Sequence, residues 1–322
     1  MKIPLYPLQF RPIFKERLWG GEKLQSLLHK PITSNQTGES WELSTVEGDV
    51  STIANGVFAG RLISSVIAEF PSEILGTAVY ERFGNQFPLL FKYLDAKEDL
   101  SVQVHPNDTL AKQRHNSFGK TEMWYVVQAD VDARLIVGFK EPINAATYVT
   151  HLEKKTLLTT LNEIKVQQGD VFLIETGTVH AIGAVMVVAE IQQTSDITYR
   201  LYDFDRVDSD GNQRELHVDL ALDAINYNTV SSQKPYQKNS NQSNPVVDCP
   251  YFTTQFIPLE GEIEVQKTGA TFTVYMCVEG SFELELAGQN YLYSKGDTVL
   301  IPAALTAFQL SGNASILEIY IS

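Results

Sequence analysis

The chain has 322 residues, 43% of them hydrophobic and 20% charged, which is ordinary for a globular protein of one large or two smaller domains. The formal net charge of −14 argues against nucleic acid or an anionic membrane as a partner. There are only two cysteines, the N-terminus has no apolar run, and no segment approaches about 18 uncharged apolar residues. We therefore expect a cytoplasmic protein without a signal peptide or a membrane-spanning segment.

Short strands separated by turns predominate along the chain. Apolar runs and alternation predict strands at residues 38–44, 87–94, 100–105, 123–127, 133–139, 165–174, 186–192 and 198–203. Short helices are expected at 22–28, 63–69 and 71–80, with two more within 141–162 and a partly amphipathic segment at 216–226. We expect 123–127 and 133–139 to pair as a hairpin. Residues 227–245 are polar and form the best linker candidate, and short strands return after them.

Two segments of the chain resemble each other. In residues 168–174 and 295–301, a Gly-Asp turn leads into an apolar strand, and the same offset places Ala307 opposite His180. This similarity favours a pair of small β-barrels or jelly rolls, of which only the first keeps the imidazole. Chance similarity of two Gly-Asp turns is the alternative.

The segment at 100–105 alternates apolar and polar residues. One face of the predicted strand carries Val102 and Val104, and the other carries Gln103 and His105, because side chains alternate with a period of two. Pro106 ends the strand just after the imidazole. Gln103 and His105 could be half of a metal site, although a polar strand face is more often simply exposed to solvent.

Two other segments could supply the remaining ligands. Glu122 stands at the start of a predicted strand, and His180 stands on a turn between two glycines. With Gln103 and His105 they form a two-nitrogen, two-oxygen set, which suits a borderline divalent cation such as zinc. The alternatives are a surface carboxylate for Glu122 and a turn histidine bonded to the backbone for His180.

Cationic side chains accompany this set. Lys120 lies two residues before Glu122, and Arg200 shares a strand face with Thr198 and Tyr202. Arginine can bind a carboxylate or a phosphate through two hydrogen bonds, but Arg200 could equally pair with nearby aspartates on the surface. Glu190 could be a general base or a partner for a lysine or arginine.

Four segments together closely resemble the type I mannose-6-phosphate isomerases in their short bacterial form. They are residues 100–108, 119–125, 177–183 and 190–206. The resemblance extends through most of residues 1–225 and is weaker beyond. It implies an all-β-dominated fold of two cupin or jelly-roll units with a few short helices. The catalytic cupin domain would cover 1–235, with a helical segment at about 141–162, and a metal-free jelly-roll domain would cover 246–322.

The resemblance also implies the site residues. One zinc ion per chain would be held by Gln103, His105, Glu122 and His180. The implied catalytic residues are Arg200, Lys120 and Glu190, and the expected substrate contacts are Lys120, Arg200, Asp196 and Trp41. The chain departs from many larger members at Gly119, where they carry histidine, and at Ile182, where they carry an aromatic residue.

The implied reaction interconverts D-mannose 6-phosphate and D-fructose 6-phosphate through an enediol or enediolate. A small sugar phosphate is the expected partner, and the chain could be a monomer or a dimer. The general base is open between Glu190, a zinc-bound hydroxide and another group. A cupin-type iron oxygenase is one alternative, although it needs neither Lys120 nor Arg200. A non-catalytic sugar-phosphate-binding cupin is another, although its ligand set would usually be eroded.

Overall fold

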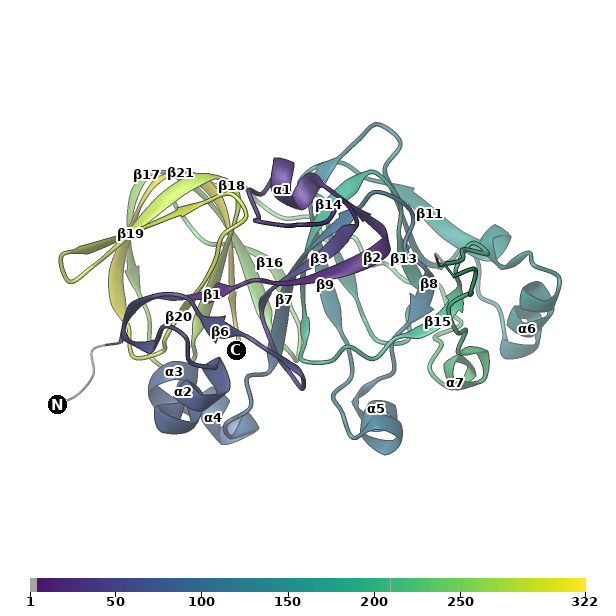
Figure 1. Cartoon of the computed structure of the whole chain (residues 1–322), viewed down its shortest axis with the longest axis horizontal. Coiled ribbons are helices and arrows are strands. Elements are labelled where there is room, and N and C mark those ends of the chain that lie inside the picture. The colour runs from purple at the N-terminus through teal and green to yellow at the C-terminus, as the bar shows by residue number, and fades with distance from the viewer. Residues whose placement is uncertain (1–4, 209) are drawn as a thin grey trace.

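The computed structural model of the chain describes residues 5–208 and 210–322. Figure 1 shows two β-rich units side by side along the longest axis, with the C-terminal strands on the left. The expectation that the chain has no signal peptide rests on its first residues, of which residues 1–4 lie outside the described part of the chain. In the described part of the chain, no helix is long and apolar enough to cross a bilayer. The cytoplasmic location stays a prediction.

Three large antiparallel sheets form the two units, which confirms the predicted all-β-dominated fold. The six-stranded sheet has the order β12 (Val171–Ile174), β9 (Glu122–Ala129), β14 (Met186–Gln193), β7 (Leu89–Ala96), β3 (Thr37–Leu43) and β2 (Ile13–Gly21). The five-stranded sheet has the order β11 (Leu161–Lys165), β10 (Arg134–Phe139), β13 (His180–Ile182), β8 (Val102–Val104) and β15 (Tyr199–Tyr202). A two-stranded sheet pairs β4 (Thr45–Val46) with β5 (Asp49–Val50).

The eight-stranded sheet forms the C-terminal unit, and two of its eight strands come from the N-terminal part of the chain. Its order is β16 (Asn244–Asp248), β17 (Thr253–Gln266), β21 (Ala307–Tyr320), β18 (Thr273–Leu286), β20 (Thr298–Ile301), β1 (Leu8–Arg11) and β6 (Thr52–Ile53), with β19 (Gln289–Ser294) beside β18. Leu8 of β1 pairs with Leu300 of β20, so the start of the chain extends this sheet. The division into domains at 1–235 and 246–322 stays a prediction.

Short helices connect the strands. They are α1 (Lys23–Ser26), α2 (Ile63–Glu69), α3 (Pro71–Leu75), α4 (Thr77–Phe83), α5 (Asp108–His115), α6 (Ala145–Glu153) and α7 (Val218–Leu222), with 3-10 turns at Gly56–Phe58 and Leu157–Thr160. The helix expected at 71–80 is split into α3 and α4 by Gly76, whose φ is 89°. The two helices expected within 141–162 are one α-helix and one 3-10 turn.

Two strand predictions were wrong. The segments at 123–127 and 133–139 do not pair: β9 pairs with β12 and β14, whereas β10 pairs with β11 and β13. Trp124 of β9 and Leu135 of β10 belong to the same buried cluster, so the strands face each other across the interior. The segment at 165–174 is also not one strand, because β11 ends at Lys165 and β12 belongs to another sheet.

The two similar Gly-Asp segments have the same local structure. Gly169 and Gly296 have φ values of 88° and 97°. The side chain of Asp170 accepts a hydrogen bond from Gln167 N at 2.9 Å, and Asp297 accepts the equivalent bond from Ser294 N at 2.8 Å. Each turn then leads into a strand, β12 or β20. The sequence similarity therefore corresponds to a repeated turn and strand, one in each unit.

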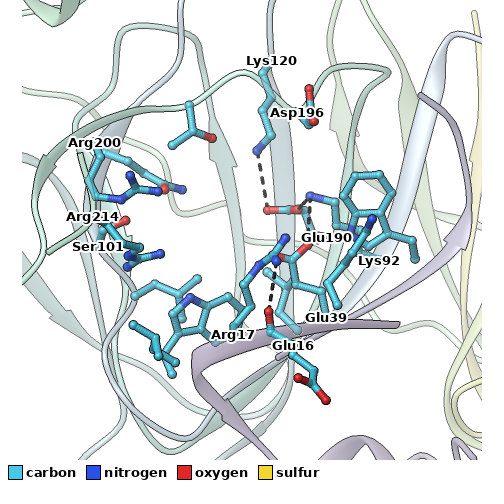
Figure 2. A pocket seen from close by; sticks show the side chains of 18 of the residues that line it. Glu16, Arg17, Glu39, Lys92, Ser101, Lys120, Glu190, Asp196, Arg200 and Arg214 are labelled. Carbon is cyan, nitrogen blue, oxygen red and sulfur yellow. Dashed lines mark hydrogen bonds and ion pairs between the residues drawn. The ribbon is translucent and has the colours of Figure 1, made fainter. Parts of the chain in front are cut away.

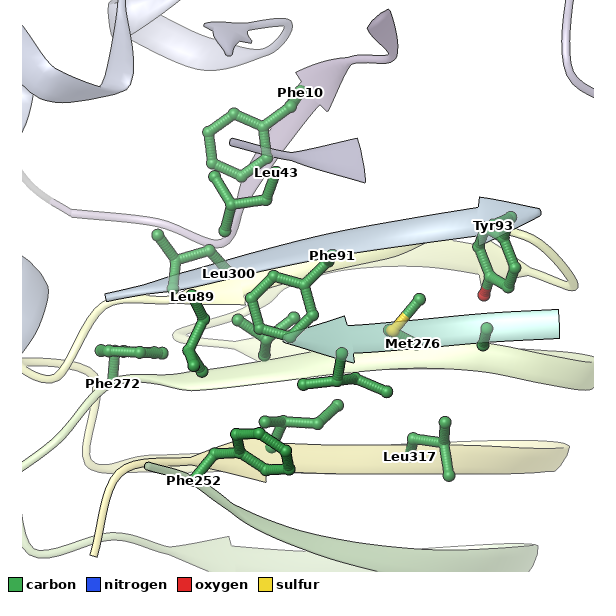
Figure 3. Packing of buried hydrophobic residues seen from close by; sticks show 14 of the residues in the cluster. Phe10, Leu43, Leu89, Phe91, Tyr93, Phe252, Phe272, Met276, Leu300 and Leu317 are labelled. Carbon is green, nitrogen blue, oxygen red and sulfur yellow. The ribbon is translucent and has the colours of Figure 1, made fainter. Parts of the chain in front are cut away.

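Alternation along the six-stranded sheet separates the candidate site from the main core. In β14, Val187 and Ile191 pack in the largest apolar cluster, whereas Val188 lies in a second cluster on the other face. Figure 3 shows Phe91 and Tyr93 of β7 packed near Met276 and Leu317 of the C-terminal unit in the largest cluster. The opposite face of the sheet is left to line the space between the six-stranded and five-stranded sheets.

Candidate active site and metal centre

The structure brings together the four predicted metal ligands between the six-stranded and five-stranded sheets. Gln103 in β8 lies opposite His180 of β13, His105 directly follows β8, and Glu122 begins β9 in the facing sheet. One ligand atom from each of His105, Glu122 and His180 lies within 4.8 Å of the other two, and all three residues are buried. This is the one such group of His, Cys, Asp and Glu side chains in residues 5–208 and 210–322.

Backbone carbonyls fix the tautomers of both histidines. The Nδ1 atom of His105 lies 2.8 Å from the carbonyl oxygen of Ile197, and Nδ1 of His180 lies 2.8 Å from that of Thr178. A carbonyl can only accept, so each Nδ1 carries the hydrogen and each Nε2 presents a lone pair. Burial lowers the pKa of both imidazoles, that of His180 to about 3, so both are neutral at pH 7. The backbone bond of His180 is thus what orients it as a potential ligand.

The acceptor atoms of this group face one another. His180 Nε2 lies 3.4 Å from Glu122 Oε1, and His105 Nε2 lies 3.6 Å from Glu122 Oε2. Glu122 Oε1 is buried and has no hydrogen-bond partner among the described residues. Two acceptors without a hydrogen between them repel, and a cation placed between them removes the repulsion. The residues present therefore fit a divalent cation.

Gln103 and Lys120 lie beside this group. Gln103 Nε2 lies 3.3 Å from the free Nε2 of His180, to which it can donate a hydrogen bond. Lys120 Nζ donates to Glu122 Oε2 and lies 3.2 Å from His105 Nε2. Burial raises the pKa of Glu122 to about 7, although Lys120 opposes the shift. Burial disfavours the charge of Lys120, but Glu122 and Glu190 outweigh it and raise its pKa.

A row of side chains crosses the six-stranded sheet next to the metal ligands. Trp41, Lys92, Glu190 and Trp124 are successive cross-strand neighbours on β3, β7, β14 and β9. Glu190 accepts from Trp124 Nε1 at 3.1 Å and pairs with Lys92 Nζ at 2.9 Å. Burial raises the pKa of Glu190, but Lys120 and Lys92 outweigh it and lower the pKa to about 2. Glu190 is therefore an ionised carboxylate of low basicity.

Arg200 is not part of a surface ion pair in this structure. Asp203 instead pairs with Arg214, whose Nε lies 2.7 Å from Asp203 Oδ2. Arg200 lies opposite Gln103 in register, and its Nη1 donates to the carbonyl oxygen of Glu215 at 2.9 Å. The Nε atom of Arg200 is buried and has no hydrogen-bond partner among the described residues. No carboxylate of those residues lies within 4.0 Å of the Arg200 guanidinium. The charge of Arg200 is thus available to a ligand.

Some of these residues line a cavity of about 480 Å³ beside the ligand group (Figure 2). Of the predicted residues, Trp41, Gln103, Lys120, Glu190, Asp196 and Arg200 lie on its wall. Trp41 Nε1 donates to Glu39 Oε2 at 2.6 Å, and its ring centroid is 5.0 Å from the ammonium groups of both Lys15 and Lys92. Trp41 is thus held in place by charged neighbours.

The cavity also contains residues that the sequence analysis missed. They include Lys15, Arg17, Glu39, Lys92 and Arg214. Strand alternation could have placed Glu39 on the same face as Trp41. Nothing in the sequence, however, shows that β2, β3 and β7 lie next to the strands that carry the predicted ligands.

The structure explains why glycine occupies position 119. Gly119 N donates to Asp108 Oδ1 at 2.8 Å, and Gln193 Nε2 donates to the same oxygen at 3.0 Å. A Cβ atom at position 119 would lie 2.7 Å from Asp108 N and 2.9 Å from the carbonyl carbon of Asn107. A histidine there would require the backbone at the start of α5 to shift. The loop that presents Lys120 is therefore built around a residue without a side chain.

Comparison with known proteins identifies the family. Residues 7–126 match the family model described as phosphomannose isomerase type I, catalytic domain, and residues 242–321 match that described as mannose-6-phosphate isomerase, cupin domain. The chain is 36% identical over 315 residues to mannose-6-phosphate isomerase ManA of Bacillus subtilis, covering 96% of each chain. The chain belongs to the type I phosphomannose isomerases.

Other relatives agree with this assignment. The chain is 33% identical over 324 residues to a mannose-6-phosphate isomerase of Streptococcus mutans, covering 97% of each. The crystal structure of the mannose 6-phosphate isomerase from Bacillus subtilis superposes with a TM-score of 0.91 at 33% identity, covering 98% of this chain and 100% of that one. The predicted membership of this isomerase family, with its cupin fold, is confirmed. The roles that the sequence resemblance implies for individual residues stay predictions for this chain.

Proposed function

We propose that this chain interconverts D-mannose 6-phosphate and D-fructose 6-phosphate through an enediol or enediolate. The observation that carries the proposal is the buried group of His105, Glu122 and His180 beside a polar cavity in which Arg200 has no acidic partner. The names of the relatives that match almost the whole chain support the choice of substrate.

We further propose that Gln103, His105, Glu122 and His180 hold one zinc ion per chain. Two neutral imidazoles, a carboxylate and an amide form a set of nitrogen and oxygen donors that suits a borderline divalent cation. When bound, the cation supplies Lewis-acid stabilisation of the negative charge that develops on a sugar oxygen during proton transfer between C1 and C2.

The chain's own residues would assist in three ways. Arg200 faces the cavity beside the strand of Gln103, where its free charge can stabilise developing negative charge. Lys120 can donate a hydrogen bond to a sugar oxygen. Asp196 and Trp41 line the wall and can position the sugar. A pKa of about 2 makes Glu190 a weak base, so we assign it to holding Lys92 and Lys120 in place.

A coupled assay of the purified chain tests the function directly. We expect turnover of mannose 6-phosphate that is lost after chelation and restored by Zn²⁺, because the bound cation supplies the Lewis-acid stabilisation of developing negative charge. Metal content is measured on the same samples. Full turnover by protein from which all metal has been removed would contradict the metal mechanism.

The same samples separate the two alternative functions. A cupin-type iron oxygenase would contain iron and consume oxygen, and it would leave mannose 6-phosphate unchanged. A non-catalytic binding protein would bind the sugar phosphate without converting it. Isomerisation in the absence of oxygen excludes both.

A further inference from the structure

The cavity wall carries more cationic than acidic side chains, and the surplus of positive charge lies at its arginines. Six cationic and five acidic residues line the cavity. Lys15 pairs with Asp49 at 2.5 Å, and Lys92 pairs with Glu190 at 2.9 Å. Lys120 is bound to Glu122. These lysines are thus neutralised by carboxylates, and the remaining cations are three arginines.

Each of the three arginines is bound by the protein through one or two guanidinium nitrogens and leaves other nitrogens free. Arg17 donates from Nε to Glu39 Oε1 at 2.7 Å and from Nη1 to the carbonyl oxygen of Glu16 at 3.1 Å. Arg214 uses Nε and Nη2 for Asp203. Arg200 uses only Nη1, for Glu215 O. Within the described residues, Nη2 of Arg17, Nη1 of Arg214, and Nε and Nη2 of Arg200 have no protein acceptor.

The arginines come from different parts of the chain and meet at the same cavity. Figure 2 shows Arg200 and Arg214 along one side of the cavity, with Arg17 extending from β2. Burial lowers the pKa of Arg200, and the charges of Arg214 and Arg17 lower it further, whereas Asp203 opposes them. Arg17 is paired with Glu39 and Arg214 with Asp203, whereas Arg200 has no acidic partner within 4.0 Å among the described residues. The group of three guanidinium groups therefore keeps a net positive charge, which favours binding of an anion.

We propose that Arg17 and Arg214 bind the phosphate of the substrate beside Arg200. A phosphate monoester offers several charged oxygens, and a guanidinium that the protein already holds through other nitrogens can donate to them with little loss of side-chain entropy. The net charge of −14 repels a sugar phosphate, so recognition requires a local cationic site. Arg200 lies opposite the proposed metal ligand Gln103, so the sugar would extend from the arginines toward the metal centre.

This proposal rests on the proposed function, because it specifies which end of the sugar phosphate each part of the cavity binds. It makes Arg17 a determinant of specificity for the phosphate. Glu39 then acts as a positioning residue: it holds Arg17 Nε at 2.7 Å and is itself held by Trp41 Nε1 at 2.6 Å.

The test compares Arg17→Gln and Arg17→Lys with the wild type. Inorganic phosphate is titrated into each protein by calorimetry, and KM and kcat are measured for mannose 6-phosphate. We expect Arg17→Gln to weaken phosphate binding and raise KM about tenfold or more, with kcat changed less than about threefold, because one charge-assisted pair is lost. Arg17→Lys should recover part of the affinity through its charge. Arg61→Gln is the matched control, because Arg61 pairs with Glu69 at 2.8 Å away from the cavity.

Unchanged phosphate affinity in Arg17→Gln would overturn the proposal, and so would a fall in kcat with an unchanged KM. Circular dichroism and metal content confirm that each variant is folded and loaded. Because calorimetry with inorganic phosphate requires no turnover, a wild type that binds phosphate without isomerising the sugar would refute the proposed function and leave the anion site intact. Isomerisation by the wild type, with phosphate affinity and KM both unchanged in Arg17→Gln, would refute only the anion site.

Discussion

At the scale of single residues, the candidate site depends on polar contacts that fix the direction of each functional atom. His105 and His180 each donate from Nδ1 to a carbonyl oxygen at 2.8 Å, which leaves Nε2 free to bind the proposed metal ion. Asp203 binds Arg214, and Arg200 is left without an acidic partner. The chemistry of each group therefore follows from what its other atoms contact.

Replacing Arg200 tests this dependence. Arg200→Ala removes the free charge beside Gln103, and we expect kcat to fall by about two to three orders of magnitude while metal content is unchanged. Steady-state kinetics and metal analysis of the same preparation provide the measurement. A variant in which only KM rises would show that Arg200 acts solely in substrate binding.

The protonation of Glu122 predicts how metal affinity depends on pH. Its pKa in the metal-free protein is about 7, above its ordinary value, so below this pH a proton must leave before a cation binds. Zinc affinity should therefore weaken as the pH falls below 7. His180, with a pKa of about 3, does not compete in this range. Calorimetry near pH 6 in buffers of different ionisation enthalpy should show the release of close to one proton. Release of none, or of two, would contradict the prediction.

At the scale of elements, short strands and tight turns place the ligands. Val102 and Val104 are fully buried on one face of β8, which directs Gln103 to the other face, and β8 lies between β13 and β15. Asn107 then caps α5 by accepting from Leu110 N at 3.0 Å. A three-residue strand between two partners thus brings Gln103 next to both His180 and Arg200.

The repeated Gly-Asp turns can be tested by a pair of glycine substitutions. Gly296 and Gly288 have φ values of 97° and 81°, but only Gly296 has neighbours: a Cβ there would lie 2.7 Å from Leu28 O. Gly296→Ala should lower the free energy of unfolding by more than about 1 kcal/mol beyond the effect of Gly288→Ala. Both variants place a side chain at a positive φ, but only the Cβ at position 296 would clash with backbone atoms. Urea denaturation measures the difference. Equal losses in the two variants would show that this contact is unimportant.

At the scale of the whole molecule, the C-terminal unit covers the back of the sheet that carries the site. Phe91 of β7 and Ile191 of β14 pack in one apolar cluster with Met276 and Leu317. The other face of the same strands carries Lys92 and Glu190 into the cavity. The C-terminal unit therefore supports the positions of Lys92 and Glu190 without contributing a residue to the cavity wall.

A core substitution tests this support. Leu317 is fully buried between the units, and Leu317→Ala should lower the free energy of unfolding by about 2–5 kcal/mol through lost burial and a residual cavity. Leu292→Ala is the control, because Leu292 is 68% exposed. Because the cluster is shared, we expect tryptophan fluorescence and circular dichroism to report one unfolding transition. Two separate transitions, with only the second sensitive to Leu317→Ala, would show that the units unfold independently.

The sequence by itself determined the local features of this protein. Alternation at Val102, Gln103 and Val104 predicted which side chains share a face, and α2 was predicted at its observed bounds, because both depend on residues close in the chain. Only the tertiary structure decided which strands are neighbours, as the wrong hairpin of β9 and β10 shows. Strand pairing depends on contacts between distant segments, and so do the freedom of Arg200 from Asp203 and the presence of Arg17, Glu39 and Lys92 in the cavity.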